Sequence, residues 1–188
     1  MSGHLYISSP NVVTWSGFKD SETDTEVNDA TLTMSLFNQT TKSPIAAGPA
    51  VDKGGGKVGI PCTAHGQVED DYIRMEGSQS YNDEFAVHAD TTANEIVIVA
   101  TFIAESFLGT EKIYIGVING CNISLPYTDS PGVYRGILPH TLGRLVEYAA
   151  NQEYGGLTTT GLYYLFVKAA KDTHKQSKRI ALQAVYDS

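Results

Sequence analysis

The stretch ATLTMSLFN at residues 30–38 decides the fold class of this 188-residue chain. Its apolar side chains, Leu32, Met34 and Leu36, stand at every second position, with threonine or serine between them. Successive side chains of a β-strand point to opposite faces, so a period of two is typical of a strand with one face in the core. The stretch therefore predicts a one-sided strand.

Short runs of the same kind follow along the whole chain, most of them bounded by Gly, Pro, Asn or Asp, the residues that favour turns. They are KVGIPCTA (57–64), DYIRMEG (71–77), NEIVIVATFIA (94–104), KIYIGVI (112–118), NISLPYT (122–128), GVYRGILP (132–139), LYYLFVKAA (162–170) and RIALQAVY (179–186). A helical pattern of a turn or two is compatible only with LGRLVEYAANQ at 142–152, which also suits a strand. The sequence predicts an all-β protein.

Composition narrows the function classes. With 41% hydrophobic and 18% charged residues, the chain has enough apolar material to bury a core. Its net charge of −8 argues against nucleic acid as the principal ligand, because phosphate binding needs clustered Lys and Arg. Neither a signal-peptide pattern at the start nor an apolar run long enough for a membrane helix is present in the sequence, so we expect no membrane association.

Two segments mark expected domain boundaries. AAGPAVDKGGG at 46–56 concentrates Gly, Ala and Pro and is typical of a connector, and ESFLGTE at 105–111 separates two strongly β runs. We therefore expect residues 52–112 to form an inserted unit, and residues 1–51 and 113–188 to form one discontinuous domain. An insertion of this kind is tolerated because the cost of loop closure grows slowly with length.

The sequence between these boundaries resembles a small β module of tailed-bacteriophage virion proteins. The landmarks are a His-Gly pair, an isoleucine-rich strand, Gly-x-x-x-Tyr-Asn and a final strand, which here are His65, Gly66, Ile73, Gly77, Tyr81, Asn82 and Ile96 to Ala100. The flanks, with ATLTMSLFN before and ISLPYTDSPGVYRGILP after, resemble an immunoglobulin-like domain of phage structural proteins. One departure is Glu69-Asp70-Asp71, where the pattern usually has a glycine beside the aspartate.

This resemblance implies an immunoglobulin-like β-sandwich with an inserted small five-stranded β-barrel. It also implies a non-enzymatic virion protein, assembled in the host cytoplasm, that forms homo-oligomers and binds capsid, portal or tail subunits. The expected position is the neck or head-to-tail connector. Alternatives are a capsid decoration protein, and an adhesion module that binds a host glycan or protein.

The sequence predicts no catalytic residue, no metal site and no cofactor. A Gly-x-Ser-x-Gly elbow is missing, and His4, His65, His88, His140 and His174 share no ligand-like spacing. We expect His65 to anchor the turn at Gly66. The two cysteines, Cys62 and Cys121, are too few for a zinc site and are expected to be reduced and buried.

Charge is polarised along the chain. Five acids and no base occupy residues 20–29, and five of the 13 basic residues fall within residues 168–179. The acidic segment is open to three interpretations: a solvated connector, a calcium loop without EF-hand spacing, or an acidic docking strip. The basic segment is either a polar hairpin loop or the complement of that strip on a neighbouring copy.

Candidate subunit-interface residues follow from the docking interpretation and from the abundance of tyrosine, a residue favoured at interfaces. They are Asp20, Glu22, Asp24, Glu26, Lys168, Lys171, Lys175, Lys178, Arg179, Tyr127 and Tyr134. If copies meet acid to base, charge reversal at Lys175 and Lys178 weakens self-assembly; unchanged assembly at moderate salt would contradict the hypothesis.

Overall fold

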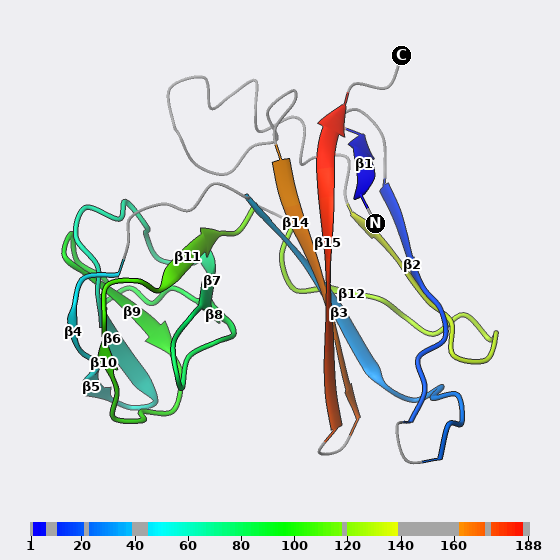
Figure 1. The fold of residues 1–188 in the computed structure, drawn as a ribbon, viewed down its shortest axis with the longest axis horizontal. Coiled ribbons are helices and arrows are strands. Elements are labelled where there is room, and N and C mark those ends of the chain that lie inside the picture. Colours follow the sequence, from blue (N-terminus) through cyan, green and yellow to red (C-terminus); the bar gives the residue numbers. More distant parts are fainter. Residues whose placement is uncertain are drawn as a thin grey trace. The chain divides into compact units, whose positions relative to one another are not determined.

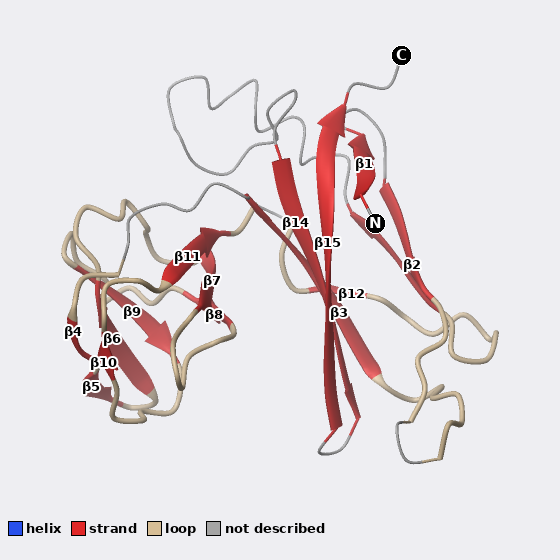
Figure 2. Ribbon diagram, in the orientation of Figure 1, coloured by secondary structure: helices blue, strands red, loops and turns tan. Residues whose placement is uncertain are grey.

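The computed structural model describes residues 2–6, 11–20, 23–38, 45–117, 120–138, 162–171 and 174–185, and the account below concerns these residues. Every element in them is a strand and none is a helix, so the all-β prediction is confirmed for this part of the chain (Figure 2). The helix-compatible segment 142–152 lies outside the described residues. The chain divides into two compact units, Met1–Phe37 with Val117–Ser188 and Asn38–Gly116, called the first and second unit below.

The first unit contains two sheets (Figure 1). The larger has the order β1-β15-β14-β3-β12, in which β1 pairs in parallel with β15, whereas the β15–β14 and β3–β12 pairs are antiparallel. The smaller is the antiparallel pair β13-β2. The strands are β1 (Ser2–Tyr6), β2 (Asn11–Trp15), β3 (Thr31–Asn38), β12 (Ile123–Ser124), β13 (Tyr134–Leu138), β14 (Leu162–Lys171) and β15 (His174–Val185).

One hydrophobic core joins these two sheets. From the larger sheet it takes the alternating side chains of β3 predicted from the sequence, Leu32, Met34 and Leu36, together with inward residues of β14. From the smaller sheet it takes Tyr134 and Leu138. The two sheets therefore bury their inner faces against each other, and the period-two pattern of residues 31–36 is explained by this burial.

Glycine is required at one point of this core. A Cβ on Gly136 would lie 2.9 Å from the carbonyl oxygen of Ser124 and 3.1 Å from side-chain atoms of Leu125 and Met34. Any larger residue would overpack the core, so Gly136 allows β13 to approach it closely.

The second unit has eight short strands in three antiparallel sheets, which do not close into a barrel. The orders are β5-β6-β9, β11-β7-β8 and β10-β4. The strands are β4 (Gly48–Pro49), β5 (Val51–Gly54), β6 (Lys57–Pro61), β7 (Tyr72–Glu76), β8 (Glu84–Ala86), β9 (Glu95–Val99), β10 (Ser106–Phe107) and β11 (Lys112–Ile115). Isoleucines dominate their common core, among them Ile60, Ile73, Ile96 and Ile113.

Neither segment expected as a boundary is a connector. Residues 46–56 contain β4 and β5, and Gly54, Gly55 and Gly56, with φ of 73°, 61° and 73°, form the turn of the β5–β6 hairpin. Residues 105–111 contain β10. The second unit thus extends from 38 to 116 rather than from 52 to 112. Glycine supplies the positive φ that a tight turn needs, and composition cannot distinguish such a turn from a linker.

Candidate functional site

The acidic segment of the first unit folds back on itself. The Asp20 carboxylate accepts the N–H of Thr23 at 3.0 Å, and the Asp20 carbonyl oxygen accepts the N–H of Asp24 at 3.0 Å. The Asp24 carboxylate pairs with Lys19 at 3.1 Å, and Glu26 pairs with Lys19 through the backbone. Glu22 lies outside the described residues. Most of this segment is exposed, and the carboxylates of Asp20 and Asp24 have partners within the same loop.

The basic segment also finds partners within its own unit. Lys171 pairs with Asp29 at 2.7 Å, and this contact lowers the pKa of Asp29. The Lys178 ammonium lies 5.7 Å from the centre of the Trp15 ring, and the Arg179 guanidinium lies 4.8 Å from the centre of the Tyr164 ring. An acid-to-base contact between the two segments is therefore made inside one chain.

Two further basic candidates complete this segment. Lys168 is half-buried on β14. Lys175 belongs to β15 by its backbone, and its side chain lies outside the described residues. Together with Lys171, Lys178 and Arg179, they show that the candidate residues are distributed over two paired strands rather than gathered in one loop.

The two candidate tyrosines differ in burial. Tyr134 is 1% exposed; its hydroxyl donates to the carbonyl oxygen of Val27 at 2.9 Å and accepts the N–H of Ala30 at 3.1 Å. Tyr134 is thus a core residue, and the expectation that it lies at a subunit surface is corrected by this burial. Tyr127 is half-buried, with its ring centre 5.7 Å from that of Tyr134.

The second unit holds a rigid surface that the sequence analysis missed. It is the segment 101–111, in which Tyr81 and Glu111 bond to the backbone and Glu105 bonds to the turn at residues 78–80. At its start, the Tyr81 hydroxyl donates to the carbonyl oxygen of Ile103 at 2.7 Å and accepts the N–H of the same residue at 2.8 Å. One buried phenol therefore satisfies both backbone groups of Ile103.

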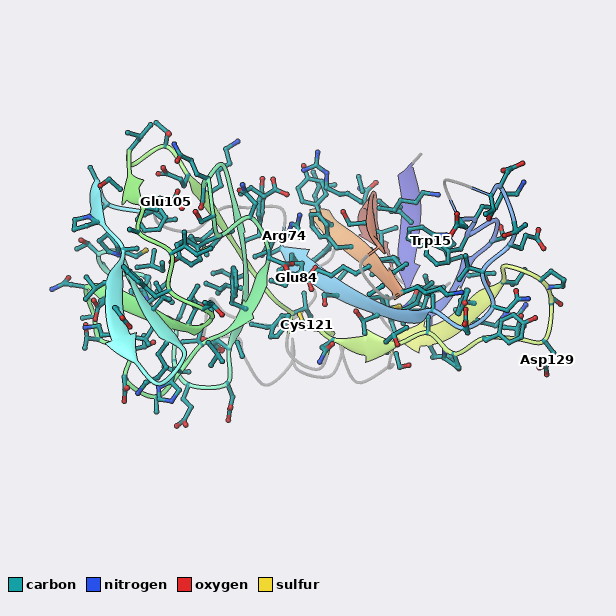
Figure 3. All side chains as sticks on the ribbon, turned by 90° about the horizontal axis from the view of Figure 1, so that it is seen from below. Trp15, Arg74, Glu84, Glu105, Cys121 and Asp129 are labelled. Atoms are coloured by element: carbon teal, nitrogen blue, oxygen red, sulfur yellow. The ribbon has the colours of Figure 1, made fainter. Side chains whose placement is uncertain are left out.

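Glu105 fixes the middle of this segment (Figure 3). Its carboxylate accepts the hydroxyl of Ser78 at 3.0 Å and the N–H groups of Gln79 and Ser80 at 2.7 and 2.9 Å. These donors belong to the turn after Gly77, whose φ is +90°. The Glu105 contacts tie the segment to the Gly-x-x-x-Tyr-Asn stretch. Hydrogen bonds to a carboxylate are stronger than those between neutral groups, so this connection is a strong one.

Glu111 fixes the end of the segment. Its side-chain oxygens accept the N–H groups of Leu108, Gly109 and Thr110 at 2.9, 2.9 and 3.0 Å, and the residue is 4% exposed. Burial raises the pKa of Glu111, but the backbone N–H groups of residues 108–111 lower it by more, so its pKa lies below the ordinary value. The carboxylate is thus held ionised as the anchor of a tight turn.

Between these anchors, the β4–β10 ribbon presents an uncharged outer face. Pro49 and Ser106 are directly paired and exposed, whereas Phe107 on the other face is buried. Ala47 and Leu108 continue the same face, since Gly109 lies close to the backbone of Ala47. We call Ala47, Pro49, Ser106 and Leu108 the ribbon face. In the sequence, Gly109 was the local sign of a turn here, since glycine readily adopts a positive φ, which is +81° at this position.

The two cysteines and the possible metal ligands were considered next among the described residues. Cys62 is fully buried, and burial raises its pKa to about 11, whereas Cys121 is only half-buried and donates to the carbonyl oxygen of Leu36 at 3.4 Å. Both thiols are free. Within the part of the chain that the structure describes, three or more potential metal ligands nowhere gather. The same part contains no helix that is long and apolar enough to span a membrane.

Comparisons with protein-family models, curated proteins and solved structures found no match for this chain.

Proposed function

We propose that this chain is a non-enzymatic structural protein of a tailed-phage virion. It acts at the neck or head-to-tail connector, or as an accessory protein, by binding neighbouring capsid, portal or tail subunits and further copies of itself. In this proposal the first unit is an immunoglobulin-like β-sandwich, and the second unit corresponds to the small β module inserted in such proteins. The virion is the site of action, and assembly occurs in the host cytoplasm.

The observation that carries the proposal is that the residues behind the phage resemblance stabilise the fold within each unit. In the second unit, His65 accepts the N–H of Gln67 on Nδ1 at 2.9 Å, across Gly66, and its Nε2 lies 2.5 Å from the carbonyl oxygen of Thr92. Tyr81 holds Ile103, and Asn82 donates to the carbonyl oxygen of Ser78. Such landmarks are expected to recur where the same module recurs.

The Gly-Val-Tyr-Arg-Gly stretch has the same character in the first unit. The Gly132 N–H donates to the Asn28 side chain at 2.8 Å with φ of +63°, Tyr134 is buried, and Gly136 has no room for a side chain. These structural roles support the proposal that the first unit shares its fold with the immunoglobulin-like domain of phage structural proteins. The step from fold to virion is the proposal itself, since one fold serves many functions.

Imaging of phage particles with this protein labelled tests the proposal. Density at the neck supports it, density over the capsid surface supports the decoration alternative, and absence from the particle overturns it. A glycan screen of the purified protein separates the adhesion alternative: specific glycan binding favours adhesion, whereas ring formation without glycan binding favours the connector.

A further inference from the structure

We infer that β2 of the first unit is a docking edge for β2 of a second copy of this chain, and that the two strands pair antiparallel about Val13. The two β13–β2 ribbons then form one continuous sheet. The inference deepens the proposed function, on which it rests for the presence of neighbouring copies, because it names the surface through which two copies meet. It follows from the backbone of β2, from its sequence and from the side chains beside it.

The smaller sheet of the first unit has one covered edge and one open edge. On the far side of β13, the Arg135 N–H donates to the carbonyl oxygen of Pro126 at 3.0 Å. The Thr128 N–H donates to the carbonyl oxygen of Val133 at 3.1 Å. On the far side of β2, no strand pairs with it within the described residues. The open edge of this sheet is therefore β2.

The Arg135 contact also determines which groups of β2 face the open edge. In an antiparallel pair of strands, the N–H and C=O of one residue point to the same side, and this side alternates along the strand. Because Arg135 directs its N–H away from β2, its partner Thr14 directs its own N–H and C=O away from β13. Val12, two residues earlier, does the same. Neither Val12 nor Thr14 has a hydrogen bond to another described residue at this edge, so these backbone groups are available to an added strand.

A second copy of β2 satisfies all of these groups. When two β2 strands run antiparallel with Val13 opposite Val13, Val12 of each copy stands opposite Thr14 of the other. Each of these is a hydrogen-bonded pair, so the N–H and C=O of Val12 bond to the C=O and N–H of Thr14. A twofold axis at Val13 makes the contact identical for both copies, as a symmetric dimer requires.

The sequence of β2 lacks the features that keep open strand edges apart. NVVTW contains neither a charged residue nor a proline, and valine, threonine and tryptophan favour strands. Natural edge strands are commonly protected by charge, proline or a bulge. In the second unit, β5 contains Asp52 and Lys53, β8 contains Glu84 and β11 contains Lys112, each at the edge of its sheet. The composition of β2 therefore favours pairing, whereas that of these strands opposes it.

The outer face beside the open edge is compatible with a second copy. Val12 and Ile137 are directly paired and are 59% and 54% exposed, so the added strand extends an apolar surface. The one charged residue of the ribbon is Arg135 on β13. In the continuous sheet the two β13 strands are separated by three strand spacings, about 14 Å, which exceeds the Debye length of about 8 Å at physiological ionic strength. Repulsion between the two copies of Arg135 is therefore largely screened.

Sedimentation equilibrium of the full-length protein at rising concentrations tests the inference. We expect a dimer, and Thr14→Lys should raise its dissociation constant at least about tenfold, because both copies then bring a cation to the edge. Thr31→Lys, at an exposed threonine of β3 in the same unit, is the matched control and should leave dimerisation unchanged. Circular dichroism and the thermal midpoint establish that Thr14→Lys is folded. A monomer at every concentration, or a folded Thr14→Lys protein that dimerises as tightly as the wild type, overturns the inference.

Cysteine cross-linking tests the register independently of Thr14→Lys. Val13→Cys should give a disulfide-linked dimer on mild oxidation, since a non-hydrogen-bonded pair brings the two Cα atoms to about 4.5 Å. Thr14→Cys is the control, because Thr14 stands opposite Val12 of the second copy and the two Thr14 Cα atoms are about 8 Å apart, beyond disulfide reach. The wild-type protein, with Cys62 and Cys121, gives the background. Absence of the Val13→Cys dimer, or equal cross-linking of both variants, overturns the inference.

Failure of the inference and failure of the proposed function are separable. A wild-type monomer that imaging places at the neck overturns the inference and leaves the proposed function standing. A dimer that Val13→Cys cross-links, formed by a protein that is absent from the particle, overturns the proposed function and supports the inference.

Discussion

The Tyr81 hydroxyl oxygen lies 2.7 Å from the carbonyl oxygen and 2.8 Å from the backbone nitrogen of Ile103, so one side chain closes a contact across 22 residues of sequence. We predict that Tyr81→Phe lowers the free energy of unfolding by about 1–3 kcal/mol, because both backbone groups of Ile103 lose their partner. Urea denaturation measures this effect. Tyr127→Phe, at a half-buried tyrosine, is the control and should change stability little; an equal loss in both variants would contradict the role assigned to Tyr81.

Glu111 gives the second unit a pH-dependent stability. Its pKa is lowered in the folded state, so its contribution is fully present above its ordinary pKa near 4.5 and is lost as the pH falls through the folded-state value. Glu111→Gln should cost about 1.5–3 kcal/mol at neutral pH, because an amide offers one acceptor oxygen to three N–H donors. Denaturation at neutral pH and near pH 3 checks both statements.

The matched control for this pH dependence is Glu69→Gln, at an exposed position in the same unit. Its stability should follow that of the wild-type protein across the pH range. If the deficit of Glu111→Gln were the same at both pH values, the ionised carboxylate would not be the anchor of the 108–110 turn.

Asp70, in the Glu69-Asp70-Asp71 stretch where the resembling pattern usually has a glycine beside the aspartate, adopts a backbone conformation that favours glycine. Its φ is +68°, in the turn that is closed by Asp71 N–H donating to Val68 O at 3.2 Å. Asp70→Gly should raise the free energy of unfolding by up to about 1 kcal/mol, since a side chain at positive φ is strained. The variant also removes a charge that, after burial, helps to raise the pKa of Asp71. Glu69→Gly, one residue earlier, should destabilise instead; a thermal shift assay distinguishes the two.

Lys178 lies over the ring of Trp15, the only tryptophan of the chain, so the fluorescence of Trp15 can detect the loss of this contact. Lys178→Met keeps the aliphatic stem but removes the cation from the ring face. We expect a shift of the Trp15 emission maximum and a loss of about 0.5–1 kcal/mol in stability. Lys168→Met on β14 is the control and should leave the emission unchanged. If Lys178→Met also leaves it unchanged, the ammonium does not lie on Trp15 in solution.

The strands were largely predictable, because each carries its own local signal. Leu32, Met34 and Leu36 alternate over a single stretch, and the structure buries all three. The anchors of segment 101–111 were not predictable in the same way. Tyr81 and Ile103, or Glu105 and Ser80, are distant in sequence, and nothing in either stretch alone specifies its partner.

Composition did not predict the local structure correctly where the same residue type is common in two different structural settings. Gly54, Gly55 and Gly56 suit a flexible linker and a tight hairpin turn equally well, and only the pairing of β5 with β6 selects the turn. Tyr134 similarly suits an interface or a core, and its burial against Val27 and Ala30 selects the core.

By itself the sequence determined the all-β class and the positions of most strands, since the period of two and the turn residues act over a few neighbouring positions. Only the tertiary structure decided where the second unit begins and ends, which charges pair within the chain, and that Leu108 is displayed on a fixed backbone. Those properties depend on contacts between distant residues, and the free energy of such contacts is set by burial and geometry that a linear pattern does not contain.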